Sequence, residues 1–384
     1  MREEMSWLEY CVSDKAVIAG NAASLLTRGD EAFGAVLEAI ARARRCVLLE
    51  FYAFSDDSVG RLFAASLREK AAQGVPVYLL YDAVGSVLTS RSFFEELAAA
   101  GVRVAEFRPV VLWKPYRNWT RRDHRKLVCI DGEKAFVGSF NITADDAPRS
   151  LGGRGWKDMT VGVRGPAVAA LEKLYWEAWS GSEGVGGPRA EPLPVSSPAP
   201  AGGKPVTVAA SPGFRNLLSI RRAYCHAIDR ARRSIRITNA YFLPDWTIYT
   251  KLVKAARRGV EVEIITPGET DHPYVRWASW SRFLHLLKNG VRLYEWRGPI
   301  LHAKAAVIDG AWCSVGSHNL DHRSLHYNLE VNLNVHDPEF CAAVSRAFDE
   351  DLKNCSVITR ADVKGRPLAS RAVSRLLYYF RTWL

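Results

Sequence analysis

Long apolar runs are missing from this sequence, and no stretch reaches the roughly eighteen consecutive apolar residues that a membrane-spanning helix needs. The opening residues, MREEMSWLEYCVSD, are acidic at first and contain no apolar core, which argues against a secretory signal. CxxC pairs are also missing, and the 7 cysteines are scattered and odd in number. These absences argue against a secreted disulfide scaffold and predict a reduced, cytoplasmic protein.

Acidic residues are also fewer than basic ones. The chain has 52 lysines and arginines against 41 acidic residues, which gives a formal net charge of +11. Such an excess predicts an anionic partner. Nucleic acid and an anionic membrane surface both fit, and charge alone does not choose between them.

Two distant stretches, at residues 121–146 and 301–324, repeat the same residue types at the same internal spacing. The shared residues are His124, Lys126, Asp131, Ser139 and Asn141 in the first copy, and His302, Lys304, Asp309, Ser317 and Asn319 in the second. A single copy could be an ordinary half-buried strand with a stray histidine. A match of this length argues against chance and predicts that both copies form one active site.

Each copy has the pattern of a β-hairpin. The runs KLVCID and AKAAVID are apolar and predict strands, and Asp-Gly pairs follow them as turn signals. Side chains two apart share a face of a strand, so each histidine points the same way as its lysine. The aspartates lie at odd offsets from the histidines, which predicts turn anchors at Asp131 and Asp309.

An imidazole, an ammonium, a hydroxyl and an amide on one surface suit a phosphoryl oxyanion, because they offer charge and oriented donors. The same set is poorly suited to zinc, since the lysine beside each histidine repels a cation. We therefore expect no metal and no other cofactor.

The motifs HRKLVCID and HAKAAVID, each followed by GSxN, resemble those of the phospholipase D superfamily. Residues 20–86 and the stretch WKDMTVGVRG at 156–165 resemble bacterial cardiolipin synthases, although, unlike several of them, this sequence is not expected to form N-terminal membrane spans. The resemblance implies that the histidines, lysines and aspartates of both motifs are catalytic. It also implies that Ser139, Asn141, Ser317 and Asn319 bind the substrate phosphate.

Two later carboxylates follow the motifs at similar places. Asp158 lies 34 residues after His124, and Glu330 lies 28 residues after His302. A carboxylate on Nδ1 fixes the histidine tautomer and supports an imidazolium. Such a role is what the superfamily resemblance implies for Asp158 and Glu330, and the alternative is an ordinary surface charge.

Strand and helix patterns alternate along both halves, which predicts an α/β fold. We expect two repeated α-β-α sandwich halves related by a pseudo-two-fold axis, with the active site at their interface. The predicted parts are an N-terminal half at 1–180, a linker rich in Gly, Pro and Ser at 181–205, and a C-terminal half at 206–360. A basic amphipathic helix is expected at 361–384, where five basic and no acidic residues follow Asp362. The aromatic and basic segment from Trp113 to Trp119 is a second candidate for membrane contact.

The resemblance implies a phosphatidyl transferase that converts two molecules of phosphatidylglycerol to cardiolipin and glycerol through a phosphatidyl-histidine. It favours phospholipid over nucleic acid, and a peripheral place on the cytoplasmic face of the inner membrane. A hydrolase or a nuclease-type phosphodiesterase of the same superfamily, and a non-catalytic binding protein, are the alternatives. The acceptor, the acyl-chain preference and the oligomeric state are left open. The resemblance suggests the N-terminal histidine, His124, as the nucleophile, but the motifs themselves are symmetric and leave this open.

Overall fold

The described strands form one continuous sheet. A computed structural model describes residues 7–13, 16–110, 121–211 and 219–382. Its sixteen strands run in the order β16-β12-β11-β10-β13-β14-β15-β9-β1-β7-β6-β5-β2-β3-β4-β8. The order outward from β1 matches the order outward from β9, so the sheet consists of two equivalent halves that meet where β1 pairs with β9.

The strands of the first half are β1 (Ile18–Leu26), β2 (Val47–Phe51), β3 (Val77–Asp82), β4 (Arg103–Phe107), β5 (Lys126–Ile130), β6 (Lys134–Gly138), β7 (Thr160–Arg164) and β8 (Glu183–Gly184). Those of the second half are β9 (Lys204–Ser211), β10 (Ser234–Asn239), β11 (Glu261–Pro267), β12 (Arg292–Trp296), β13 (Lys304–Ile308), β14 (Trp312–Gly316), β15 (Glu330–Val335) and β16 (Cys355–Ile358). Both predicted hairpins are present as β5–β6 and β13–β14.

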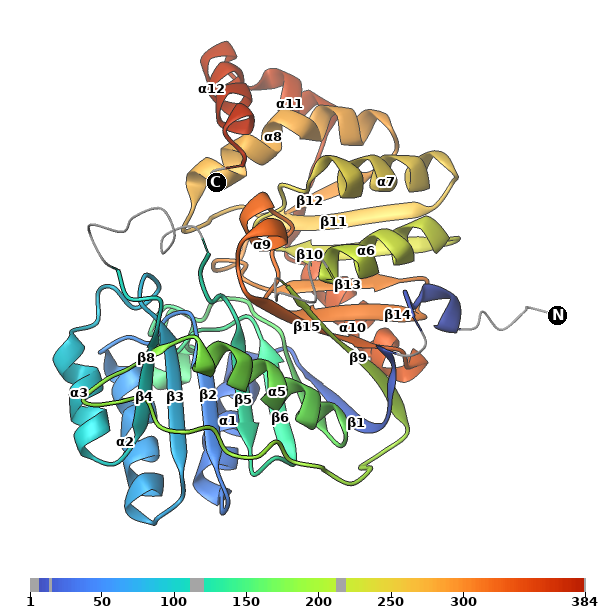
Figure 1. Ribbon diagram of the computed structural model, residues 1–384. Helices are drawn as coiled ribbons and strands as arrows, with labels where there is room; N and C mark the ends of the chain where they lie inside the picture. The colour runs from blue at the N-terminus through green and yellow to red at the C-terminus, as the bar shows by residue number, and fades with distance from the viewer. Residues whose placement is uncertain (1–6, 14–15, 111–120, 212–218, 383–384) are drawn as a thin grey trace.

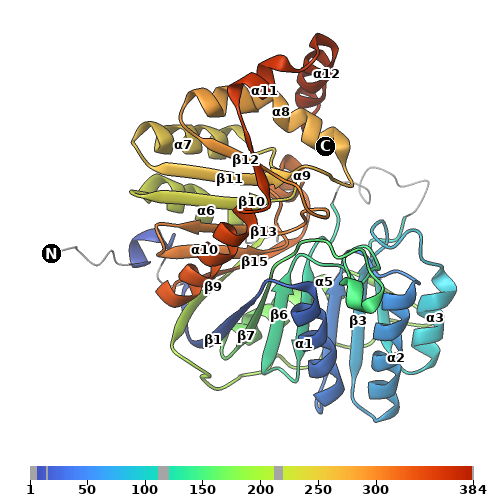
Figure 2. The same cartoon turned by 180° about the vertical axis from the view of Figure 1, so that it is seen from behind.

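Helices cover both faces of each half (Figures 1 and 2). In the first half, α1 (Gly29–Arg42), α2 (Ser58–Ala72) and α3 (Arg91–Ala99) lie opposite α5 (Ala167–Ser180). In the second, α6 (Ser219–Arg230), α7 (Trp246–Arg257) and α8 (Pro273–Lys288) lie opposite α10 (Pro338–Leu352). The predicted pair of α-β-α sandwiches is confirmed.

The two halves share a hydrophobic core. One buried cluster contains Trp179 of α5 and Phe348 of α10 together with strand residues such as Val161 and Val331. Two further clusters lie under the outer helices of each half. Because the shared cluster includes strands from both halves, the burial of apolar surface holds their relative orientation.

The segment predicted as a linker at 181–205 packs on the first half. The hydroxyl of Tyr78 donates to the carbonyl of Glu191 at 3.0 Å, and Ser196 donates to the carboxylate of Glu172 at 2.6 Å. Gly, Pro and Ser predicted flexibility here, but side chains of the first half bind backbone groups of Ala190, Glu191 and Ser196. The division of the chain into four parts remains our proposal.

The N-terminal segment does not stay with the first half, to which it was assigned. The short helix η1 (Trp7–Tyr10) lies against the second half, where the hydroxyl of Tyr10 donates to Asp309 at 2.6 Å. Glu9 of the same helix forms an ion pair with Arg232 at 2.8 Å.

The C-terminal segment forms two helices where one was predicted. They are α11 (Arg360–Gly365) and α12 (Leu368–Tyr379), and Pro367 separates them because proline disfavours a helical residue before it. Leu377 and Tyr378 of α12 pack on a buried cluster that includes Val275 and Ala278 of α8. None of the helices in the described part of the chain is both long and apolar enough to span a bilayer. The candidate membrane segment from Trp113 to Trp119 lies outside the described residues.

Candidate active site

The two hairpins place the same kinds of side chain, a histidine and an asparagine from each, around one cavity. In each, an aspartate and a glycine with positive φ turn the chain: 56° and 69° at Asp131 and Gly132, and 54° and 66° at Asp309 and Gly310. Two consecutive positive φ values match the right-handed twist of the strands, as the Asp-Gly signals predicted. His124 and His302 then lie two residues before the first residues of β5 and β13.

Backbone hydrogen bonds tie each histidine segment to the other half of the molecule. The backbone N–H of His124 donates to the carbonyl of Leu329 at 2.9 Å, next to Glu330. The N–H of His302 donates to the carbonyl of Lys157 at 2.8 Å, next to Asp158. Each histidine is therefore placed beside the carboxylate of the opposite half.

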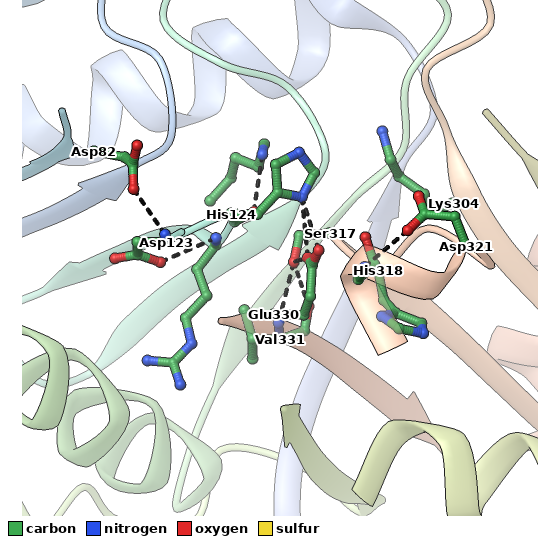
Figure 3. Close-up of polar contacts among 12 residues, drawn as sticks. Asp82, Asp123, His124, Lys304, Ser317, His318, Asp321, Glu330 and Val331 are labelled. Atoms are coloured by element: carbon green, nitrogen blue, oxygen red, sulfur yellow. Dashed lines mark hydrogen bonds and ion pairs between the residues drawn. The ribbon is translucent and has the colours of Figure 1, made fainter. Parts of the chain in front are cut away.

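Glu330 binds His124. Its Oε1 and Oε2 lie 2.9 and 3.1 Å from Nδ1 of His124, and Figure 3 shows the carboxylate between this ring and Ser317. The hydroxyl of Ser317 donates to Oε2 at 2.5 Å and accepts from the backbone N–H of Val331 at 3.1 Å. The carboxylate is thus held in one orientation, and it fixes the tautomer of His124 with Nε2 free of the proton.

The other histidine has a matching carboxylate and one more. Nδ1 of His302 lies 3.2 Å from Oδ2 of Asp158, whose Oδ1 accepts from the hydroxyl of Ser139. Oδ1 of Asp146 lies 3.4 Å from the same Nδ1. Asp158 and Glu330 thus each lie within hydrogen-bond distance of a histidine Nδ1, as the predicted role requires. Each carboxylate binds the histidine of the other half of the molecule. Asp146 was missed, although it lies inside the first repeated stretch.

The serines do not face the substrate in the way the resemblance implied. The hydroxyl hydrogens of Ser139 and Ser317 are committed to Asp158 and Glu330. A phosphate can only accept, so these hydroxyls cannot donate to it at the same time. Asn141 and Asn319, by contrast, line the cavity in front of the histidines and remain candidates for binding phosphate.

The motif aspartates lie at the far ends of the strands from the histidines. Asp131 accepts from the backbone N–H groups of residues 44, 45 and 46 at 2.6 to 3.0 Å, and Asp309 does the same for residues 232, 233 and 234 at 2.7 to 2.8 Å. Each aspartate anchors the hairpin turn to the start of a neighbouring strand. This agrees with their odd spacing and corrects the catalytic role that the motif resemblance implied.

A further buried carboxylate, Asp82, positions the chain just before His124. It binds the guanidinium of Arg122 at 2.9 Å. It also accepts from the backbone N–H of Asp123 at 2.8 Å, as Figure 3 shows. Asp82 ends β3, where the carboxyl ends of the parallel strands point toward the site. Nothing in the motif spacing pointed to it.

The histidines open into a cavity of about 360 Å³ between the two halves. Its walls include Tyr52, Trp156 and Tyr241 beside the catalytic groups. The ammonium groups of Lys126 and Lys304 each donate to the carbonyl of the histidine two residues earlier, at 2.9 and 2.5 Å. Both ammonium groups are fully buried. Each has further N–H donors that could bind an anion.

Burial changes the proton affinity of both lysines. It lowers the pKa of Lys126 to about 7, although the carboxylate of Glu330 opposes this. Burial likewise lowers the pKa of Lys304 to about 8, against the carboxylates of Asp158 and Asp146. The two charges are therefore lost near neutral pH unless an anion binds between them.

The two histidines are shifted in opposite directions. Burial lowers the pKa of His124 well below its ordinary value, and the charges of Lys126 and Lys304 lower it further. Burial and Lys304 also lower the pKa of His302, but hydrogen bonds with Asp146 and Asp158 outweigh them, and it ends above its ordinary value. The surroundings therefore disfavour a positive charge on His124 and favour one on His302.

Three groups in the described part of the site, Asp146, Asp158 and His302, have ligand atoms within 4.8 Å of one another, as a metal ion requires. Their charges already have partners, because His302 and Lys304 are the cations that face both carboxylates. A protonated His302 also has no lone pair on Nδ1 for a metal. The site thus fits a proton-donating histidine better than a metal ligand set, and the expectation of no metal stays a prediction.

These pKa values predict how activity depends on pH. Lysine is charged below its pKa, so both ammonium charges are present below about pH 7 and disappear as the pH rises through about 8. We expect the KM for a short-chain phosphodiester to rise steeply over this interval, because the phosphate loses its counter-charges. Initial rates measured from pH 5 to 9 test this. A KM that stays constant to pH 9 contradicts it.

A site built twice by the same hairpin, with one histidine, one lysine and one asparagine from each copy, is typical of the two-motif phospholipase D superfamily. The family model described as "Cardiolipin synthase, PLD-like domain" matches residues 36–162 and 224–352. These two matches fall on the two halves of the sheet, and each contains one hairpin.

Named relatives agree with this family. The cardiolipin synthase of Geobacillus thermodenitrificans is 35% identical over 373 residues, which cover 96% of this chain and 74% of that protein. Cardiolipin synthase 2 of Bacillus anthracis is 35% identical over 87% of this chain and 65% of its own length. The crystal structure of phosphatidylserine synthase from Haemophilus influenzae Rd KW20 has the same fold, with a TM-score of 0.75 over 94% of this chain and 95% of that one at 13% identity.

The chain belongs to the cardiolipin synthase family of the phospholipase D superfamily. The expectation of a cardiolipin synthase-like enzyme with a phospholipid substrate is confirmed at this level.

Proposed function

We propose that the protein transfers a phosphatidyl group from one phosphatidylglycerol to a second, giving cardiolipin and glycerol. The observation that carries this proposal is the pair of histidines in one cavity, each held at Nδ1 by a carboxylate of the opposite half. One neutral and one protonated imidazole facing the same phosphorus are what a double displacement needs.

In the first displacement, the lone pair on Nε2 of His124 attacks the phosphorus. The bond from phosphorus to the glycerol oxygen breaks, and its electron pair stays on that oxygen. His302 donates its proton to this oxygen, and free glycerol leaves. The product is a phosphatidyl group on His124, whose positive ring Glu330 stabilises at 2.9 Å.

In the second displacement, His302 is neutral and acts as a base. It takes the proton from a hydroxyl of the second phosphatidylglycerol, and that oxygen attacks the phosphorus. The bond between phosphorus and His124 breaks, and its electron pair returns to Nε2. Cardiolipin leaves, and both histidines are back in their starting states.

Lys126, Lys304, Asn141 and Asn319 are the groups we propose for the non-bridging oxygens. The lysines supply positive charge, and the amides line the cavity in front of the histidines. A buried, water-poor site makes such fixed charges more effective than they are in water. No step of this scheme requires a metal ion.

The acceptor is tested by the products. Purified protein incubated with phosphatidylglycerol vesicles should release glycerol and cardiolipin in equal amounts, as measured by mass spectrometry of the lipids and an assay for glycerol. Phosphatidic acid as the main product would instead indicate a hydrolase in which water attacks the intermediate.

We further propose that the protein works as a peripheral protein on an anionic membrane, at the cytoplasmic face of the inner membrane, and that α12 contributes to the contact. One side of α12 packs on α8, but its other side exposes Leu368, Leu376, Tyr379 and Phe380, which are 78, 60, 75 and 47% exposed. The segment after Asp362 also carries five basic residues and no acidic one. Apolar and basic groups together favour binding to an anionic bilayer surface.

The exposed side of α12 can be altered without changing the residues that pack on α8. The triple variant Leu376→Ser/Tyr379→Ser/Phe380→Ser should bind phosphatidylglycerol vesicles about tenfold or more weakly, because it removes exposed apolar surface that the bilayer would bury. Co-sedimentation with vesicles measures this. Leu62→Ser, on α2, is the matched control for losing an exposed apolar side chain, and it should bind normally. Unchanged binding of the triple variant would place the membrane contact elsewhere.

A further inference from the structure

The two halves of the active site differ in where an aspartate follows the motif asparagine. Counting five residues past the motif asparagine reaches Asp146 in the first copy and Ser324 in the second. The histidine, lysine, serine and asparagine before it are the same in both copies, and a carboxylate follows in each. Two residues past the asparagine the order is reversed, with Thr143 in the first copy and Asp321 in the second. Asp321 accepts from the backbone N–H of Ser324 at 2.8 Å, whereas Asp146 reaches a histidine.

Asp146 faces His302 from the first half. It is 3% exposed, and its Oδ1 lies 3.4 Å from Nδ1 of His302. Its Oδ2 accepts from the hydroxyl of Thr143 at 2.8 Å and from the amide of Asn141 at 3.3 Å. The carboxylate is thus fixed in place, and its free oxygen points toward the histidine.

His302 consequently lies against two carboxylates, since Oδ2 of Asp158 is 3.2 Å from the same nitrogen. His124 has one, Glu330, which binds it through both oxygens. Ser324, at the position of Asp146, is close enough for its hydroxyl to lower the pKa of Glu330, but it adds no charge. The cations Lys126 and Lys304 lie near His124, and Lys304 lies near His302.

The second carboxylate has a direct chemical consequence. It favours the imidazolium form of His302, which can give a proton to a leaving oxygen but has no lone pair to attack phosphorus. With a single carboxylate and two nearby ammonium groups, His124 keeps its lone pair. We infer that Asp146 is a positioning residue that assigns the roles of the two histidines, holding His302 as the acid and leaving His124 as the nucleophile. This inference rests on the phosphatidyl transfer proposed above.

A change of leaving group tests this assignment. p-Nitrophenolate leaves without a proton, so a phosphatidyl p-nitrophenyl ester does not need the acid. Asp146→Asn should lower the rate of glycerol release from phosphatidylglycerol by about ten- to a hundredfold, while p-nitrophenol release changes by less than about threefold. Equal losses on both substrates would mean that Asp146 only supports the fold, and would overturn the inference.

A matched control is available away from the cavity. Asp56→Asn makes the same chemical change at a carboxylate that binds Arg61 at 2.7 Å and does not line the cavity. It should keep both rates within about twofold of the unaltered protein. Glu330→Gln, which acts on the nucleophile, should lower both rates by a similar factor, because nucleophilic attack is common to both substrates.

The exchange variant Asp146→Ser/Ser324→Asp gives the sharpest result. It moves the second carboxylate to the side of His124, and the phosphatidyl adduct formed from the p-nitrophenyl ester should move from His124 to His302. Peptide mass spectrometry after a quench at neutral or alkaline pH locates the adduct.

An adduct that stays on His124 overturns the inference while leaving the transfer mechanism intact. Absence of an adduct from the unaltered protein would overturn the proposed mechanism itself and the inference with it. Should the exchange variant fail to fold, the leaving-group comparison decides alone.

Discussion

Protein with His302→Ala is expected to carry a phosphatidyl group on His124 after mixing with phosphatidylglycerol. The nucleophile is intact in this variant, but the acid that serves glycerol and the base that activates the acceptor are missing. The adduct should therefore form slowly and be consumed more slowly still. Cardiolipin synthesis should fall by about a thousandfold or more, because general acid–base catalysis is lost in both displacements.

The reverse variant, His124→Ala, is expected to form no adduct and to lose activity to at least the same extent. Mass spectrometry of the intact protein and of its peptides distinguishes the two variants. His285→Ala is a suitable control, since it removes an imidazole of α8 that binds Tyr249 rather than lining the cavity. An adduct on His302 in the His124→Ala protein would exchange the two roles, and no adduct in either variant would remove the covalent mechanism.

The carboxylates should have the next largest effect. Glu330→Gln and Asp158→Asn are each expected to lower turnover by about tens- to thousands-fold while the protein stays folded, because each histidine loses the group that fixes its tautomer. Steady-state rates, together with circular dichroism as the check on folding, measure this.

The exchanged pairing makes this prediction more specific. Glu330 binds His124, so Glu330→Gln should slow formation of the phosphatidyl adduct. Asp158 binds His302, so Asp158→Asn should chiefly slow the loss of glycerol and spare a leaving group that needs no proton. Near-normal turnover in both variants would show that neither carboxylate supports catalysis.

Local features of the hairpins were predictable from the sequence. The Asp-Gly pairs predicted turns that the positive φ values of Asp131 and Asp309 confirm. The odd offset of these aspartates also predicted their role as anchors. Each of these conclusions depends only on neighbours within one hairpin, where sequence distance limits what the chain can do.

Contacts between the halves were not predictable in the same way. Sequence spacing placed Glu330 and Asp158 after their own motifs, but it does not tell which histidine each one reaches. The exchange follows from the backbone contacts of Leu329 with His124 and of Lys157 with His302, which exist only once the two halves pack. The sequence analysis also did not predict the pairing of the central strands β1 and β9. This pairing is a contact between the two halves, so it too depends on how they pack.

Asp146 and the two serines show the limit most clearly. The hydroxyls of Ser139 and Ser317 donate to Asp158 and Glu330, which lie 19 and 13 residues further along the same half. Asp146 differs from its counterpart Ser324, and that difference was readable in the aligned motifs. Its meaning appeared only when the fold placed it 3.4 Å from a histidine of the other half.

The stereochemical course at phosphorus tests the central claim of two displacements through His124 most directly. A phosphatidylglycerol analogue with sulfur in place of one non-bridging oxygen, of known configuration, is converted by the unaltered protein, and the configuration of the product is determined. Each in-line displacement inverts phosphorus, so the two steps proposed here predict net retention. Net inversion would mean that the acceptor attacks the donor directly in a single step, and would contradict the phosphatidyl-histidine mechanism.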